Sequence, residues 1–383
     1  MIPEPNTPRA FDERPTAKFK SEPEDFVVNE IEAYAPSGTG EHLHVRLEKR
    51  LWTTPLAAAQ LARALGVDPR LASWAGLKDR VGVTTQTISL PWPVARPFEE
   101  ALAGVQEPGL RVLGAARHGN KLKPGHLAGN RFRIRLRGLD PSSAEQISAR
   151  LERAALEGVP NAFGAQRFGR DGDNPARALA WLSGRERGPR DKRQARLLYS
   201  ALQSMLFNEL LERRLADGSW REVLPGEVAK RCDSGGLFDV PESGAELEEA
   251  RERAARFEIT ATGPMFGASM RKPSAEALAL EQAVLAERGI AEDAFKPLQR
   301  LGEGTRRPLR VALSDLAIEA RSDGLELAFV LPKGSYATTL LELACRLDEP
   351  VTRPQNPERT LPGAGPDDAL VESDLDEGST SDG

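Results

Sequence analysis

One aspartate in this 383-residue sequence lies in a setting that suits chemistry on a sugar or a base. Asp79 stands between two cations, Lys78 and Arg80, shortly after Gly76, which permits a tight turn. Neighbouring positive charge keeps a carboxylate ionised even where it is partly desolvated. A reference pKa of about 3.9 leaves it charged at neutral pH, so it needs no activating partner to act as nucleophile or base. Spacing alone favours a turn residue in a solvated charged loop, because turns often recruit Asp, and both interpretations stay open.

Histidines and cysteines are too few for a metal centre or a disulfide framework. The four histidines are His42, His44, His118 and His126. His42 and His44 would share one face of a strand, but no third ligand stands at a suitable spacing. The two cysteines, Cys232 and Cys345, are far apart in sequence, which is typical of a reducing compartment. With no Walker-type loop and no G-x-S-x-G elbow, we expect neither a metal nor an organic cofactor.

Short strings rich in Phe, Gly, Asn and Arg recur along the chain. They are DFVVNE (25–30), GNRFRI (129–134), PNAFGAQRFG (160–169), SALQSMLFN (200–208), GPMFG (263–267) and FVLPKGSYATT (329–339). Each string alone is compatible with core packing and turns. Aromatic rings beside Asn and Arg also suit RNA, whose bases stack on rings and guanidinium planes.

The elements that must position these residues follow from periodicity. The clearest strand is 131–137, where Phe132, Ile134 and Leu136 alternate with four arginines, so one face is apolar and the other basic. We also predict strands over 25–31, 81–90 and 325–331, and helices capped by Thr54, capped by Ser142 or Ser143, and running over roughly 193–215. Strands and helices mix without regular alternation, which favours an α+β fold over a doubly wound nucleotide-binding fold.

The composition is that of an ordinary soluble protein, with 40% hydrophobic and 28% charged residues. The net charge of −5 is set by the last stretch, 360–383, which holds seven acidic residues and no Lys or Arg. The remainder has 52 basic and 50 acidic residues, and a body near neutrality can still carry a basic groove. No signal pattern and no apolar run of roughly 18 residues is present, so we expect a cytoplasmic protein that is not in a membrane.

Taken in chain order with AGLKDRVGVTTQ (75–86), the strings resemble the signature of the tRNA pseudouridine synthase D family. The resemblance covers roughly residues 18–346, with seven strings in register. Members convert a uridine in tRNA to pseudouridine, in bacteria at position 13. The resemblance therefore implies an isomerase that acts on tRNA without a cofactor and without an obligate protein partner.

The resemblance also implies an architecture. We expect an α+β pseudouridine synthase catalytic domain with a central mixed or antiparallel sheet, interrupted by an inserted α/β domain special to the family. The boundaries that we expect are a mobile N-terminus over 1–17, a catalytic domain over 18–154 and 305–348, an insertion over 155–304, and a disordered acidic tail over 349–383.

The resemblance assigns roles residue by residue. The implied site residues are Asp79 as catalytic carboxylate, Lys20 as its basic catalytic partner, and Phe26, Asn130, Phe132 and Phe329 as substrate-binding groups. Phe132 matches the place where most other pseudouridine synthase families carry Tyr. We expect the target base to be flipped out of the RNA at a cost of a few kcal/mol. Asp79 would then form a covalent adduct with the sugar or remove its C2′ proton, and both routes stay open.

Two other functions use the same residues. A catalytically silent RNA-binding or RNA-folding protein would keep the groove without turnover. An RNA hydrolase or glycosylase would use the same carboxylate but release free uracil or cleave the chain. The arginine face of 131–137 has two interpretations as well, phosphate contact or a solvated strand face.

Overall fold

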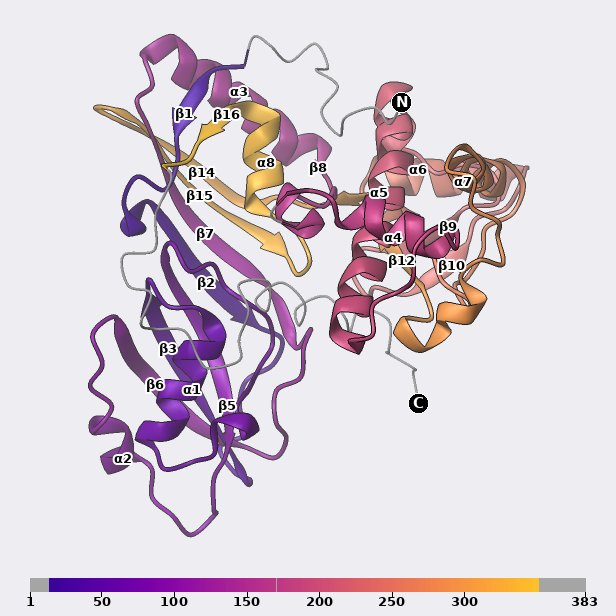
Figure 1. Cartoon of the computed structure of the whole chain (residues 1–383). Coiled ribbons are helices and arrows are strands. Elements are labelled where there is room, and N and C mark those ends of the chain that lie inside the picture. The colour runs from indigo at the N-terminus through magenta and orange to yellow at the C-terminus, as the bar shows by residue number, and fades with distance from the viewer. Residues whose placement is uncertain (1–13, 170, 351–383) are drawn as a thin grey trace.

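The computed structural model describes residues 14–169 and 171–350, which form two main sheets with helices packed on them (Figure 1). The larger sheet has ten strands: β1 (Thr16–Lys18), β2 (Phe26–Glu32), β3 (His42–Arg50), β4 (Ser73–Trp74), β5 (Val83–Pro91), β6 (Leu110–His118), β7 (Leu127–Arg137), β14 (Ser314–Arg321), β15 (Gly324–Pro332) and β16 (Arg346–Asp348). The smaller sheet has four strands: β9 (Val228–Arg231), β10 (Leu237–Asp239), β11 (Ile259–Met265) and β12 (Thr305–Pro308). A two-stranded pair, β8 (Val159–Pro160) and β13 (Arg310–Val311), completes the strands of the described residues.

The α-helices of the described residues are α1 (Thr54–Ala64), α2 (Glu99–Ala103), α3 (Pro141–Glu157), α4 (Asn174–Leu182), α5 (Lys192–Ala216), α6 (Ala245–Ala255), α7 (Ala275–Glu287) and α8 (Ala337–Ala344). Short 3-10 segments lie at Pro23–Asp25, Pro69–Leu71, Ala165–Phe168, Ser219–Arg221 and Lys296–Leu301. None of the helices in this part of the chain has the length and apolar character needed to cross a bilayer.

The large sheet is mixed. Its main path runs β14-β15-β7-β2-β5-β3-β6, in which β2 and β5 pair in parallel and the other neighbours pair antiparallel. Mixed strands covered by helices, with a second sheet apart from them, confirm the predicted α+β class.

The predicted strand at 131–137 is the centre of this sheet and extends back to Leu127. Its apolar side chains, Phe132, Ile134 and Leu136, are buried against α3 and α8, while α1 covers the same face of β3 and β5. All three helices therefore lie on one face, and the side chains that alternate with this core point to the other.

The second sheet packs around the 25-residue helix α5, and the chain passes between the two parts where β8 pairs with β13 (Figure 1). Strand β12 pairs with β11, so residues 305–308 belong by hydrogen bonding to the smaller sheet. The sheet pairing thus puts the second crossing a few residues after the predicted boundary at 304.

The two ends of the described chain meet in the large sheet. Thr16, Ala17 and Lys18 of β1 pair in parallel with Arg346, Leu347 and Asp348 of β16. Residues 16 and 17, expected within a mobile segment, are instead part of a strand, and Ala17 is fully buried. Residues 1–13 of the expected N-terminal segment and residues 351–383 of the expected acidic tail lie outside the described residues.

The sheet parts between β2 and β5. The two strands pair over only Val27–Asn29 and Val83–Thr85, after which β5 takes β4 as its neighbour. The connection from β4 to β5, residues 75–82, lies at this opening and carries Asp79; we call it the Asp79 loop.

Gly82 is the last residue of the Asp79 loop and packs closely against Phe26 of β2. We expect any side chain at this position to lower the stability of the fold. Its φ is +155°, and an added Cβ would lie 2.6 Å from the Phe26 carbonyl oxygen. Gly82→Ala should lower the free energy of unfolding in urea by about 2–3 kcal/mol, from backbone strain plus the clash. Gly66→Ala is the matched control, because Gly66 has φ +69° with nothing within 4 Å of the added atom. It should cost only about 1 kcal/mol, and equal losses would contradict the close approach to Phe26.

Candidate active site

A buried lysine holds the backbone of the Asp79 loop. The ammonium of Lys49 donates to the carbonyl oxygens of Asp79 (2.6 Å), Lys78 (3.1 Å) and Trp52 (2.7 Å). Only 1% of Lys49 is exposed, and this burial lowers its pKa to about 7. The charge of Asp79 acts in the opposite direction and raises that pKa.

Two buried polar side chains hold the same loop from α1 and β5. The Thr54 hydroxyl accepts from the Lys78 amide (3.0 Å) and donates to Gln86 (2.8 Å), whose amide nitrogen donates to the carbonyl of Gly76 (3.1 Å). The predicted cap of α1 was Thr54, but the structure uses Thr53, which accepts from the Leu56 amide. The shift of one residue leaves the Thr54 hydroxyl available for the loop.

Glu30 and Lys78 form an ion pair inside the opening of the sheet. Their side chains lie 2.7 Å apart and are both buried. The other carboxylate oxygen of Glu30 accepts from the amide of Thr87 at 3.2 Å, so a side chain replaces the strand partner that β5 loses there. Lys78 is next to Asp79 in the sequence, but its side chain turns inward and pairs with Glu30.

The cation that does reach Asp79 comes from far away in the sequence. Lys20 Nζ lies 3.4 Å from Asp79 Oδ1, across 59 residues. Lys20 is only 10% exposed at its side chain, and its ammonium lies 4.4 Å from the centre of the Phe26 ring and 4.9 Å from that of Phe19. The Asp79 side chain is 54% exposed, so the carboxylate is paired and still accessible.

Lys20 also holds a left-handed backbone conformation, with φ +54°. Such conformations cost a non-glycine residue about 1 kcal/mol or more, and they gather at functional sites. One of the five described non-glycine residues with positive φ is therefore also a catalytic candidate.

The predicted aromatic residues form one continuous stack beneath this pair. Phe26 lies 6.2 Å from Phe132, and Phe132 lies 5.2 Å from Phe329, measured between ring centres. Phe26 is next to Lys20, whereas Phe329 is 0% exposed and belongs to the core under α3 and α8. The structure thus places Lys20 and Phe26 beside the exposed Asp79 carboxylate, and the rings of Phe26, Phe132 and Phe329 are all buried.

Asn130 has a polar atom without a partner. On β7 it lies between Glu30 of β2 and Leu331 of β15. Its buried Oδ1 accepts no hydrogen bond from any described residue. Buried polar atoms are rarely left unpaired in folded proteins, so this oxygen is a candidate ligand-binding group.

The arginine face of β7 is neutralised within the protein. Each of its four arginines has a carboxylate partner: Arg131 with Asp315, Arg133 with Glu326, Arg135 with Asp323, and Arg137 with Asp25, Glu22 and Asp323. The paired guanidinium groups favour a structural role over the phosphate contacts considered from the sequence.

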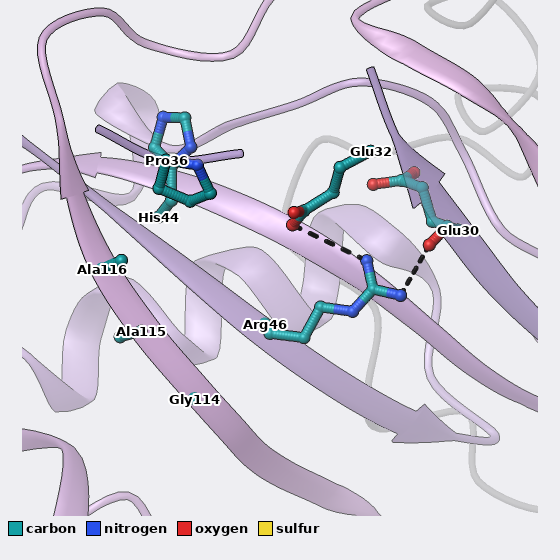
Figure 2. Close-up of a pocket in the computed structure, with 8 residues that line it drawn as sticks. All are labelled: Glu30, Glu32, Pro36, His44, Arg46, Gly114, Ala115 and Ala116. Carbon is teal, nitrogen blue, oxygen red and sulfur yellow. Dashed lines mark hydrogen bonds and ion pairs between the residues drawn. The ribbon is translucent and has the colours of Figure 1, made fainter. Parts of the chain in front are cut away.

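A cavity of about 360 Å³ lies on the opposite face of the sheet from α1 (Figure 2). Its lining residues are Glu30, Glu32, Pro36, His44, Arg46, Gly114, Ala115 and Ala116. The Arg46 guanidinium crosses it, donating to the Glu30 carbonyl oxygen at 2.6 Å and lying 3.8 Å from Glu32. None of the six residues predicted for the site lines this cavity, which is occupied by an internal ion pair. Within the described residues no group of three or more His, Cys, Asp or Glu could hold a metal ion.

Comparison with known proteins decides the family. The sequence model of tRNA pseudouridine synthase D (TruD) matches residues 12–175 and 190–343. The chain is 46% identical over 333 residues to the tRNA pseudouridine synthase D of Anaeromyxobacter dehalogenans, covering 85% of this chain and 92% of that protein. The chain belongs to the tRNA pseudouridine synthase D family.

Two further comparisons also show similarity to proteins of the tRNA pseudouridine synthase D family. The enzyme of Thermus thermophilus is 43% identical over 333 residues, covering 86% of this chain and 89% of its own. The crystal structure of a Methanosarcina mazei protein assigned to the family aligns with a TM-score of 0.67 and 24% identity, over 86% of this chain and 94% of that chain. That likeness shows the fold.

The sequence did not point to the groups that support the Asp79 loop. One signal was available for Lys49. In HLHVRLEKR (42–50) it continues the apolar face of Leu43, Val45 and Leu47, where a lysine is out of place. Thr54 and Gln86 gave no such signal, because their partners come from other elements.

The Glu30–Lys78 pair should be strongly coupled. Glu30→Gln leaves the buried Lys78 ammonium without its counter-charge, so we expect a loss of about 3 kcal/mol in the free energy of unfolding. Combining it with Lys78→Met should restore at least about 1 kcal/mol. Glu24→Gln, at an exposed pair with Arg50 (2.7 Å), is the control and should cost less than about 1 kcal/mol in the same urea titrations. Strictly additive losses in the double variant would mean that the pair is not coupled.

Proposed function

We propose that Asp79 is the carboxylate through which this chain converts a uridine of tRNA, at position 13, to pseudouridine. The observation that carries the proposal is the pairing of an accessible Asp79 carboxylate with Lys20 above the Phe26 ring. A charged oxygen beside an aromatic surface offers a nucleophile or base next to a place where a base can stack.

The reaction needs charge stabilisation at the sugar. The C1′–N1 bond breaks and a C1′–C5 bond forms, while C5 loses a proton and N1 gains one, so the product keeps the mass of the substrate. Breaking the glycosidic bond puts positive charge on the sugar, as in glycoside hydrolysis, where a carboxylate stabilises or traps it. Asp79 has two routes, attack at C1′ or removal of the C2′ proton, and both begin with the ionised carboxylate that Lys20 faces.

The neighbouring residues supply recognition in this proposal. The uracil stacks beside Phe26, while Phe132 and Phe329 hold that ring from below. The unpaired Asn130 Oδ1 accepts from the N3–H of the base, which would satisfy its missing hydrogen bond. Enclosure by these groups keeps the detached base in place while it turns to present C5.

The substrate partner in this proposal is tRNA, and no protein partner is required. We also propose the cytoplasm as its compartment. Both cysteines, Cys232 and Cys345, are free thiols, as expected in a reducing environment.

Asp79→Asn should abolish pseudouridine formation and leave tRNA binding within about threefold of the wild type, because it removes the charge and keeps the shape. Turnover is measured by chemical labelling of pseudouridine in tRNA, and binding by filter retention. The matched control is Asp239→Asn, which breaks an exposed pair with Arg271 in the smaller sheet (2.7 Å) and should leave turnover unchanged.

Each other outcome has a distinct meaning. Residual turnover by Asp79→Asn would show that another group is the catalytic carboxylate. Release of free uracil or cleaved RNA by the wild type would identify a glycosylase or hydrolase. Binding without any product would identify a silent RNA-binding protein, and labelling at another nucleotide would overturn position 13.

Asn130→Ala tests base recognition separately from chemistry. Loss of one hydrogen bond to the bound base should lower kcat/KM by about tenfold while the fold is kept. Asn29→Ala, a half-buried asparagine on the adjacent strand that points to the other face, is the control. Equal kcat/KM for the Asn130 variant and the wild type would remove Asn130 from the substrate site.

A further inference from the structure

The ammonium of Lys49 is satisfied entirely by main-chain oxygens. Its three donors meet three carbonyls, those of Trp52, Lys78 and Asp79, at 2.6–3.1 Å. No carboxylate of a described residue forms an ion pair with it. A buried charge without a counter-ion is costly, so a lysine at this position needs a reason beyond packing.

The three carbonyls belong to two segments, the chain just before α1 and the Asp79 loop. Trp52 precedes α1, Lys49 is the next-to-last residue of β3, and the other two carbonyls are those of Lys78 and Asp79 in the loop. The ammonium therefore fixes the main chain of the Asp79 loop to β3 and to the start of α1. The side chain of Asp79 extends from this anchored residue, and its carboxylate pairs with Lys20 at 3.4 Å.

We infer that Lys49 is a positioning residue: its buried ammonium sets the direction of the Asp79 carboxylate by holding the carbonyl of the same residue. The inference rests on the proposed function of Asp79. It assigns no contact between Lys49 and the RNA.

The protonation state of Lys49 should matter in the neutral range. An ammonium donates three hydrogen bonds and a neutral amine only two, so one of the three carbonyls loses its donor when the proton leaves. Burial lowers the pKa to about 7, Asp79 raises it and Lys78 lowers it, while Glu30 neutralises Lys78 from β2. The start of α1 contributes only the uncharged Thr54 hydroxyl.

Stability and activity should respond to this proton in opposite directions. The unfolded chain keeps the Lys49 proton up to about pH 10.5, whereas the folded chain releases it near pH 7. Between these values the unfolded state binds more protons, so this group makes the fold more stable as pH rises. Over the same interval the Asp79 loop loses a hydrogen bond, and kcat should fall.

The test compares full-length wild type with Lys49→Met, which keeps an unbranched side chain up to the ε position and removes the ammonium. We expect the wild-type kcat for tRNA to decline above an apparent pKa near 7. The variant should have a kcat at least about tenfold lower, no such decline, and KM for tRNA within about twofold, since misplacement of a reacting group affects the chemical step. Amide hydrogen exchange in residues 76–82 should also be faster in the variant than in the wild type at pH 6.

Arg214→Met is the matched control. Arg214 is likewise buried and also donates to main-chain carbonyls, those of Ser219 and Glu222, but around α5 and far from Asp79 in the fold. It should lose stability and keep the wild-type pH profile of kcat.

Two results would overturn the inference. One is a Lys49→Met protein that is less stable yet keeps the kcat and pH profile of the wild type. The other is unchanged exchange in residues 76–82. If the wild type forms no pseudouridine, the proposed function fails, and loop exchange still decides whether Lys49 holds the Asp79 loop.

Discussion

The parting of β2 from β5 is the constraint from which the candidate site follows. A sheet that opens leaves main-chain donors and acceptors without strand partners, and each must find another partner or pay for its burial. The Glu30 carboxylate accepts a hydrogen bond from the Thr87 amide. Thr54 of α1 and Gln86 of β5 form hydrogen bonds with the Asp79 loop, and Lys49 donates to three carbonyl oxygens. The polar groups at the opening thus hold the Asp79 loop in place, whereas a continuous sheet would have offered only a flat surface.

The proposed chemistry draws on the large sheet alone. Lys20, Phe26, Asp79 and Asn130 all come from its strands or the loops beside them, whereas the smaller sheet contributes none of the proposed residues. The smaller sheet has its own buried ion pairs, including Arg214 with Glu227 and Arg306 with Glu281. Burial raises the pKa of Glu281 to about 7, the effect opposite in sign to that on Lys49.

Much of the fold could be predicted from the sequence, because the signals are local. The alternation of Phe132, Ile134 and Leu136 with arginines marks a strand with one buried face, and β7 is that strand. The environment of Asp79 could not be predicted in the same way. Its sequence neighbours suggested Lys78 as the tuning cation, but a side chain's direction depends on which strand opens beside it. Lys20 entered only through family resemblance, since nothing in its own segment points to a residue 59 positions away.

The pairing of β1 with β16 has a consequence for how the protein is made. Residues 16–18 leave the ribosome first among the described strands, but their parallel partner, residues 346–348, leaves last. Lys20 follows β1 by two residues, and β1 pairs with β7 as well as β16, so its place beside Phe26 depends in part on a strand that is synthesised late. A nascent fragment that contains Asp79 but ends before residue 346 would lack the pairing of β1 with β16. Long-range contacts of this kind form slowly. The proposed Lys20–Asp79 pair would then gain this support only after residues 346–348 have been synthesised.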